Sequence, residues 1–545
     1  MKPELLLNEH LGEDALGYLL NLERHQVQEL VSNPDRPRWD ERREAAIQRL
    51  SSVAAQLQDE VARELRWSNW LGSCGDGQSE SVGTIIRQSC GGEIKSALPE
   101  TDPVTTSLTA LAIDLYAVLL VLGREDPRFG SHFGSATFRH PLDGRFQEAV
   151  LSDKELVKLF PHSPGQLDWQ RQGNSLRSTG QGGGNQLAGF ASSVITAGLD
   201  FASLAQAEVT VDSLVDGVRQ MLTLVRSAIA GRPAVVPVRI GLTGVILPDT
   251  CQLLDLGWAK LRPADDRDER IVRRTALEGR LQGHSSDGDT VIIRYSGDVV
   301  LETELEYQIE VHADVGTLDS KWPNDLAALR KVDELVENVR LGILLACPDA
   351  RPLIVAATWR AIIDPLSAAL SVGWSDPQAI RTLTPTRLAD AQAAEWAGWS
   401  KKIHDYRAAG VSVAIRRMLM ATADRRLPED VLVDAIVVWE NLFGGANETT
   451  LRVSTALAWL LASTADARRD RQKRFKKIYG LRSRVVHGAP NVNQKELQKS
   501  AVEAVQVSLE ALRQVFGDRT DLLRMGSGAE RSEALLLGGW TEGCP

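Results

Sequence analysis

The C-terminal third of the sequence repeats apolar side chains at the spacing of an α-helix in five successive segments. The segments cover about 411–426, 429–443, 449–463, 468–487 and 493–512, and short connections join them. Amphipathic helices that follow one another so closely bury their apolar faces against each other. The pattern therefore predicts a helical bundle over residues 400–520.

Each segment defines a face that we expect to be buried in this bundle. The expected core residues are, in chain order, Val411, Ala414, Ile415 and Met418; Leu432, Ala435, Ile436, Trp439 and Phe443; Val453, Ala456, Leu457, Leu460 and Leu461; Phe475, Ile478, Tyr479, Val485 and Val486; and Leu497, Ala501, Val505, Leu509 and Leu512. Asn447 and Asn493 are the expected N-caps of the third and fifth helices. Gly488 and Pro490 are typical of a helix end after His487.

The remaining sequence divides into regions of different character, since 545 residues are too many for one hydrophobic core. Residues 1–230 show helical spacing, as in 41–65 and 106–123. Residues 231–320 contain short runs rich in Val and Ile, such as "AVVPVRIGLTGVILP", which predict a small β-rich module. We expect a helical connector over 321–399 and a loose C-terminal tail over 521–545. The predicted fold class is multidomain and mainly α.

Composition limits the location and the partners of the chain. A net charge of −10 argues against a protein that simply coats nucleic acid, so any nucleic-acid site must be local. The five cysteines form no CxxC pair, and no metal site or cofactor is expected. The N-terminus lacks the apolar core of a signal peptide, and the apolar stretch 108–122 contains Asp114, which favours a buried helix. These features predict a cytoplasmic protein that does not enter a membrane.

One strongly basic segment interrupts this acidic chain. From Arg468 to Lys477 seven of ten residues are Lys or Arg. Such a run either binds phosphates or forms a solvated helix face, and the run alone does not decide between them. The residues that we expect to contact RNA, if it binds here, are Arg468, Arg469, Arg471, Lys473, Arg474, Lys476, Lys477 and the nearby Arg484.

Arg482 and His487 follow on the same segment at the spacing R-x4-H. Five helical residues separate the two side chains by about 140°, so a single phosphate could contact both only in a groove or at an interface. A histidine at a helix C-terminus suits proton transfer near neutrality, and arginine suits a phosphate that gains charge. The spacing alone is unspecific, because the nine histidines and many arginines of the chain would produce about one such pair by chance.

The surrounding residues make the pattern more specific. "FKKIYGLRSRVVHG" resembles the motif of the HEPN family, in its Apea-like branch, where a tyrosine, "LRS", two apolar residues and "HG" recur in this order. The preceding "LPEDVLVDAIVVWENLFGG" resembles the helix of that branch with an Asp near its start and a Glu before "LF". More distantly, "VRIGLTGVILP", "LRPADDRDER" and "EYQIEV" are similar to a strand-rich region that precedes the domain. The resemblance covers about 235–520 and is most specific over 410–490.

The resemblance implies a metal-independent endoribonuclease that acts as a homodimer. Arg482 and His487 match the two catalytic positions, and Ser483 matches the polar position after the arginine. The implied reaction is 2′-OH transesterification, which leaves a cyclic phosphate, and the implied role is toxin activity or antiviral defence. A trigger or regulatory partner would then act on the N-terminal region. The alternative is a HEPN-like module for dimerisation or RNA binding without catalysis.

Tyr479 and Glu440 are the expected supporting residues of this site. Glu440 lies at the edge of an apolar helix face, where it could pair with Arg482, position His487 or serve as a structural carboxylate. Asp434 is expected to point away from the same face into solvent.

Overall fold

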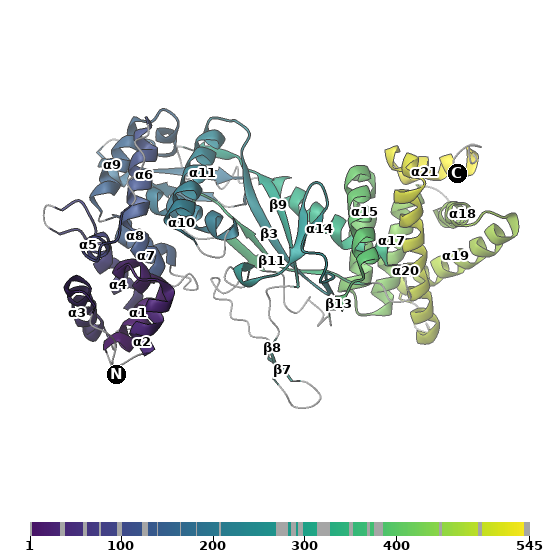
Figure 1. The fold of residues 1–545 in the computed structure, drawn as a ribbon. Coiled ribbons are helices and arrows are strands. Elements are labelled where there is room, and N and C mark those ends of the chain that lie inside the picture. Colours follow the sequence, from purple (N-terminus) through teal and green to yellow (C-terminus); the bar gives the residue numbers. More distant parts are fainter. Residues whose placement is uncertain are drawn as a thin grey trace.

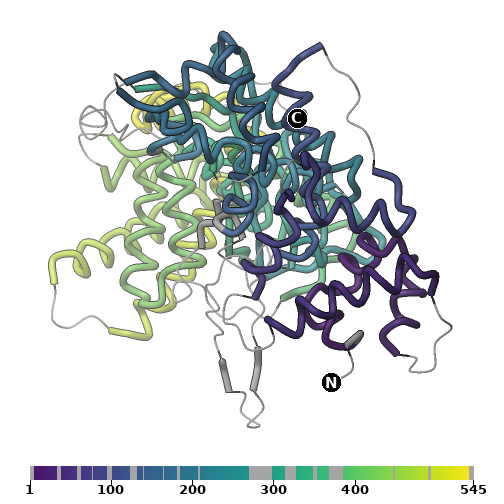
Figure 2. The backbone as a smooth tube through the Cα atoms, turned by 90° about the vertical axis from the view of Figure 1, so that its left-hand side faces the viewer, coloured from purple at the N-terminus to yellow at the C-terminus, as the bar shows by residue number. Residues whose placement is uncertain are grey.

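The computed structural model describes residues 3–32, 39–57, 63–75, 78–94, 101–122, 129–138, 140–163, 165–180, 182–205, 209–268, 282–284, 290–292, 298–312, 327–347, 353–367, 371–374, 385–445, 449–488 and 493–538. These residues form a mainly α-helical protein with a smaller β part, as expected. Figure 1 shows helices of the N-terminal region at one end, a sheet in the middle and the C-terminal helices at the other end. Figure 2, turned by 90°, shows the yellow-green C-terminal helices emerging to one side of the N-terminal ones.

The N-terminal region is a helical assembly with one short hairpin. Its elements are α1 (Pro3–Leu20), α2 (Arg24–Ser32), α3 (Glu41–Gln56), α4 (Arg63–Leu71), α5 (Val82–Ser89), α6 (Pro103–Asp114), α7 (Tyr116–Val121), α8 (Phe129–Phe138), α9 (Pro141–Ser152), η1 (Leu156–Leu159), η2 (Asp168–Gln170), β1 (Gln172–Arg177), β2 (Gly182–Gln186), α10 (Leu187–Ala205) and α11 (Val211–Ile229). The expected helix over 106–123 is two helices divided at Leu115, and the one over 41–65 is α3 followed by the start of α4.

Helix α10 is the apolar centre of this region. Within the described residues it is the one helix long and apolar enough to cross a membrane, and 72% of its most apolar window is buried inside the molecule. Gly198 of α10 faces Gly217 of α11, where an added Cβ would come within 2.6 Å of backbone. The two glycines therefore let the helices pack in close backbone contact, which suits a core helix.

A six-stranded antiparallel sheet forms the middle of the molecule, in the order β12-β11-β3-β9-β6-β5. The strands of this region are β3 (Val235–Thr243), β4 (Val245–Ile246), β5 (Leu254–Asp255), β6 (Lys260–Pro263), β7 (Gln282–His284), β8 (Thr290–Ile292), β9 (Val299–Glu306), β10 (Ile309–His312), β11 (Ala356–Ile362), β12 (Ser371–Trp374) and β13 (Thr386–Arg387). Strand β10 leaves this sheet and pairs with the N-terminal hairpin β1–β2.

The expected helical connector over 321–399 is wrong in part. It contains α14 (Ala327–Ala346) and the start of α15 (Asp390–Tyr406), but also β11, which pairs along β3 at the centre of the sheet. Trp359 of β11 fills the space above Gly241 of β3, where an added Cβ would lie 2.0 Å from its indole nitrogen. The sheet therefore needs a strand from beyond residue 320 to complete it.

Helix α14 belongs to two hydrophobic cores at once. Its Val332, Val336 and Ile343 pack in the core of the sheet, whereas Leu341 and Leu344 pack in the core of the C-terminal helices. Such a shared helix couples the position of the sheet to that of the C-terminal bundle.

The C-terminal bundle contains the five predicted helices. Its elements are α15, η4 (Ala409–Val411), α16 (Ser412–Leu419), the π-helical turn η5 (Met420–Asp424), α17 (Pro428–Phe443), α18 (Thr449–Leu461), α19 (Ala465–Val486), α20 (Gln494–Gly517), η6 (Thr520–Arg524) and α21 (Gly528–Leu537). The predicted apolar faces are buried, apart from four residues at the edge of the core. Leu461, Tyr479 and Val485 are half-buried there, and Val486 is a wrong prediction, because its side chain is 52% exposed. Asn493 caps α20 as expected, while Asn447 lies outside the described residues.

The predicted loose tail over 521–545 is wrong for residues 521–537, which contain most of η6 and all of α21. Arg531 anchors α21, with its guanidinium buried and donating to the carbonyl oxygens of Asn441 (2.7 Å) and Leu442 (2.8 Å). These carbonyls belong to the C-terminal end of α17, where the helix dipole favours a cation. Burial lowers the pKa of Arg531. The tail thus fixes the end of α17, next to Glu440.

Candidate active site on helix α19

Helix α19 carries every candidate residue except Glu440. It begins at Ala465, where the Thr464 hydroxyl accepts a hydrogen bond from the Ala467 N–H (3.3 Å), and ends at Val486. His487 is the C-cap residue, and Gly488 follows with a φ of +68°, the left-handed conformation that glycine adopts at a helix end. The local sequence thus places His487 at the helix end, as predicted.

Glu440 joins two of the predicted site residues. Its Oε1 accepts a hydrogen bond from the Tyr479 hydroxyl at 2.5 Å, and its Oε2 lies 3.6 Å from Nη2 of Arg482. The side chains of Glu440 and Arg482 are 25% and 23% exposed, so the ion pair is partly shielded from water. Of the roles left open for Glu440, the structure shows the pairing with Arg482, which a structural carboxylate would also make, and no contact with His487 among the described residues.

Tyr479 and Arg482 are both constrained by this contact. Burial raises the pKa of Tyr479 far above its usual value of 10.0, and the hydrogen bond to Glu440 raises it further. Tyr479 is therefore a neutral hydrogen-bond donor at any physiological pH. The Nε of Arg482 is buried and has no hydrogen-bond partner among the described residues, so one donor of the guanidinium is not satisfied by them.

His487 lies apart from this cluster. Its side chain is exposed, and among the described residues it makes no hydrogen bond or ion pair. Ser483 is half-buried, and its carbonyl oxygen accepts the His487 N–H at 3.1 Å. The structure therefore brings Arg482, Tyr479 and Glu440 together, but it does not bring His487 to them within one chain.

Three of the basic residues face acidic residues of α20. Arg471 Nη1 lies 3.0 Å from Glu510, Arg474 Nε donates to Glu503 at 2.7 Å, and Lys477 Nζ lies 3.1 Å from Glu496. We call these three pairs the α19–α20 ladder. Its glutamates recur every seven residues along α20, and this regular spacing is the signal in the sequence that could have revealed the ladder. The ladder makes three of the seven basic residues of this run contacts between two helices.

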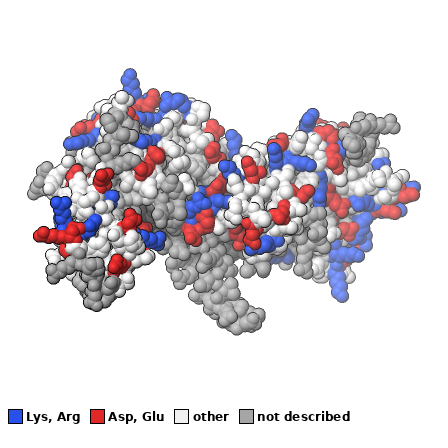
Figure 3. Space-filling view, viewed as in Figure 1, with Lys and Arg blue, Asp and Glu red and all other residues white. Residues whose placement is uncertain are grey.

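The other basic residues of α19 divide into two groups. Arg468 lies over the ring of Trp459, 3.8 Å from its centre, and Arg469 pairs with Asp466. Lys473, Lys476 and Arg484 are exposed and have no ion pair with any described residue. Figure 3 shows the concentration of Lys and Arg at this end of the molecule.

The expectation that Asp434 points into solvent is wrong. Its side chain is 1% exposed and lies 2.7 Å from both Arg417 and Arg425, which come from α16 and from the segment after η5. The hydrogen bond with Asp434 raises the pKa of Arg425. Position on one helix cannot reveal such partners, because they come from neighbouring elements. Asp434 is a structural residue, about two turns from Glu440.

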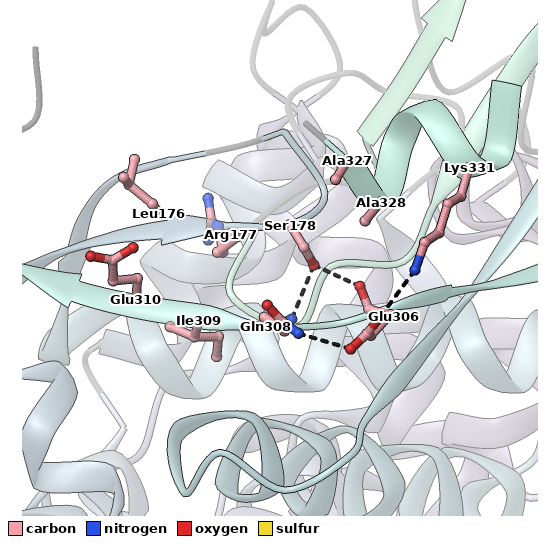
Figure 4. A pocket seen from close by; sticks show the side chains of 10 residues that line it. All are labelled: Leu176, Arg177, Ser178, Glu306, Gln308, Ile309, Glu310, Ala327, Ala328 and Lys331. Atoms are coloured by element: carbon pink, nitrogen blue, oxygen red, sulfur yellow. Dashed lines mark hydrogen bonds and ion pairs between the residues drawn. The ribbon is translucent and has the colours of Figure 1, made fainter. Parts of the chain in front are cut away.

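A second feature of the structure is a pocket of about 310 Å³ between β1, β10 and the first turns of α14. Figure 4 shows Gln308 and Lys331 pointing toward Glu306, which they contact at 2.8 and 3.7 Å. Arg177 lies 3.2 Å from the buried carboxylate of Asp364. Among the described residues that line the pocket, Glu306, Lys331 and Arg177 each have a partner of opposite charge, although Nε and Nη1 of Arg177 make no hydrogen bond. Elsewhere in the described residues, no group of three or more His, Cys, Asp or Glu side chains could hold a metal ion.

Comparison with known proteins identifies no relative of this chain. No protein-family model matches the chain, and no curated protein or solved structure is significantly similar to it. The interpretation of α19 therefore rests on its residues and their geometry.

Proposed function

We propose that the protein is an endoribonuclease of the HEPN type, with Arg482 and His487 as its catalytic residues. The observation that carries this proposal is the arrangement on α19, where a partly buried arginine is held by Glu440 and an uncommitted histidine caps the same helix. In the proposed reaction a ribose 2′-OH attacks the adjacent phosphorus, the bond to the 5′-oxygen of the next nucleotide breaks, and a 2′,3′-cyclic phosphate remains. Arg482 stabilises the charge on the phosphate, and His487 transfers a proton.

A second protomer is part of this proposal. Attack by the 2′-OH needs a base for its proton and an acid for the leaving oxygen, whereas each chain offers one motif histidine. Arg482 faces its own bundle and His487 faces solvent. A twofold arrangement of two α19 helices would supply the second histidine and close a groove around the phosphate.

The test of the chemistry is incubation of the purified protein with total RNA in EDTA, followed by analysis of the product ends. Cyclic phosphate or 2′/3′-phosphate ends opposite 5′-hydroxyls are expected, because no metal takes part. Dependence on added metal, or 3′-hydroxyl ends, would contradict the mechanism.

The proposed dimer is tested by combining wild-type and variant chains in one sample. When His487→Ala protein is co-expressed with wild type, the cleavage activity should fall below the activity expected from the amount of wild-type chain. The reason is that each mixed dimer has only one intact histidine. Wild-type protein that is a monomer by light scattering at the assay concentration, yet cuts RNA, would contradict the composite site.

The pairing of Arg482 within the chain favours one alternative, a HEPN-like module that dimerises or binds RNA without cutting it. The two proposals separate in the same assay, since only the first yields product. In either case we place the protein in the cytoplasm. A trigger acting on the N-terminal region could reach the bundle through α14, whose first turns line the pocket of Figure 4. The proposed biological role is toxin activity or antiviral defence, by analogy with the family.

A further inference from the structure

The exposed side of α19 is a single cationic stripe that ends at the proposed catalytic histidine. Helical geometry places Lys473, Lys476, Gly480, Arg484 and His487 within about 80° of one another around the helix. All five are exposed. Arg482 lies about 180° from Lys473, on the side that faces Glu440. The stripe and the Glu440 cluster therefore occupy opposite sides of the same helix.

The stripe contains the basic residues that the fold leaves unpaired. Arg471, Arg474 and Lys477 are neutralised by the α19–α20 ladder, whereas Lys473, Lys476 and Arg484 have no ion-pair partner among the described residues. A cation without a carboxylate partner can bind a phosphate without first breaking an internal contact. These six cations of α19 thus separate into a structural half, which contacts α20, and an available half.

Gly480 lies in the middle of the available half. Glycine in a helix interior is destabilising relative to alanine, so its presence needs a reason. Gly198 and Gly342 have such a reason inside the fold, because an added Cβ would lie 2.6 Å from Val218 and 2.3 Å from Ser400, respectively. A Cβ at Gly480 would meet nothing within 4 Å. Packing against the described residues therefore does not explain Gly480, as it does not explain Gly398 of α15.

We infer that this stripe is the track on which the sugar–phosphate backbone of single-stranded RNA lies, with its closest approach to the helix at Gly480. Lys473 and Lys476 would hold phosphates on one side of the glycine and Arg484 on the other, leading the strand to His487. In the proposed dimer the two stripes would flank the shared groove, where the phosphates of the RNA would screen the repulsion between their cations. This inference rests on the proposed function for the identity of the nucleic acid.

The test measures binding separately from cleavage. The probe is a 2′-O-methyl oligouridine of about twenty nucleotides, which lacks the attacking hydroxyl and cannot be cut by this chemistry, titrated over a range of salt. Cleavage of ordinary RNA is measured in parallel. Protein that binds the probe but cuts no RNA would refute the nuclease and leave the track intact. Protein that cuts RNA but does not bind the probe would refute the track.

Two triple variants with the same change of charge compare the halves of the basic run. The combination Lys473→Gln, Lys476→Gln and Arg484→Gln should reduce the slope of log affinity against log salt by about 2, since each lost contact removes about 0.7. The combination Arg471→Gln, Arg474→Gln and Lys477→Gln should change the slope less and lower the melting temperature instead. Equal slopes for the two variants would overturn the division.

Two substitutions of different size test the role of Gly480. Gly480→Leu should weaken binding of the probe about threefold or more without lowering the melting temperature, and Gly480→Ala should weaken it less. Gly398 of α15 is also exposed with nothing within 4 Å of an added Cβ, so Gly398→Leu is the control and should leave binding unchanged. Normal binding by Gly480→Leu would refute the close approach.

Discussion

Two histidines of this protein, His140 in the N-terminal region and His487 in the C-terminal bundle, stand in opposite environments. The His140 side chain is fully buried, with Nε2 2.6 Å from Asp114 and Nδ1 accepting the Leu142 N–H at 3.2 Å. Asp114 in turn accepts the Ser81 N–H at 3.0 Å. His487 is exposed, and its side chain contacts no described residue through a hydrogen bond or ion pair.

The difference separates a structural role from the chemical role that we propose for His487. Both ring nitrogens of His140 are engaged and shielded, so the ring cannot exchange a proton with a substrate, and its contacts hold α9 against α5 and α6. His487 lies at the end of the same helix as Arg482, and among the described residues neither of its ring nitrogens has a hydrogen-bond partner. A pair formed by a histidine and a carboxylate is therefore not by itself the mark of an active site here.

The largest effect on RNA cleavage among the substitutions that test this comparison is expected for Arg482. Arg482→Ala should lower RNA cleavage at least about 100-fold, because it removes the group that stabilises the phosphate. Arg471→Ala is the matched control: it also removes one positive charge from α19, but from the ladder, and should retain most of the activity. Equal losses of cleavage activity in both variants would mean that Arg482 contributes only its positive charge and has no specific role at the phosphate.

The next largest effect concerns His140. His140→Ala should reduce the free energy of unfolding by about 3 kcal/mol, because it leaves a buried aspartate without its partner. Cleavage per folded molecule should be unchanged. Denaturant unfolding checks the first statement, with His162→Ala, an exposed residue, as control. A His140→Ala protein as stable as wild type would show that the buried pair is not a structural one.

The smallest effect is expected at Glu440. Glu440→Gln should lower cleavage about tenfold, less than Arg482→Ala, because the arginine loses its orientation but stays in place. The pKa of Tyr479 should also fall, since the neutral amide no longer opposes a negative phenolate. Absorbance titration of the tyrosines, compared with Tyr479→Phe, measures this fall. An unchanged titration would mean that Glu440 does not govern Tyr479.

The sequence predicted the parts of the bundle that depend on local periodicity. The faces containing Ile415, Trp439 and Leu457 are buried as expected, and Gly488 ends α19. The predictions fail where a segment distant in the sequence determines the environment of a residue. Asp434 is buried by arginines from neighbouring elements, and Arg531 turns a presumed tail into a helix that caps α17.

The candidate site was predictable to a similar extent. The motif located Arg482 and His487, and it offered Glu440 as a partner of Arg482. Helical geometry also gave about 140° between the two motif residues, but it could not show which of them faces the bundle, nor that Glu496, Glu503 and Glu510 lie opposite three of the basic residues. Both findings require the crossing of α19 over its neighbours, which local spacing does not specify.

The central claim is that His487, the uncommitted histidine, transfers protons in RNA cleavage. The most direct measurement is the cleavage rate of His487→Ala protein in EDTA, at a concentration matched to wild type and with the melting temperature checked. We expect a loss of about 100-fold or more with an unchanged melting temperature, the scale of a positioned acid or base. Near-normal cleavage by the folded variant would contradict the assignment and remove the nuclease site from α19.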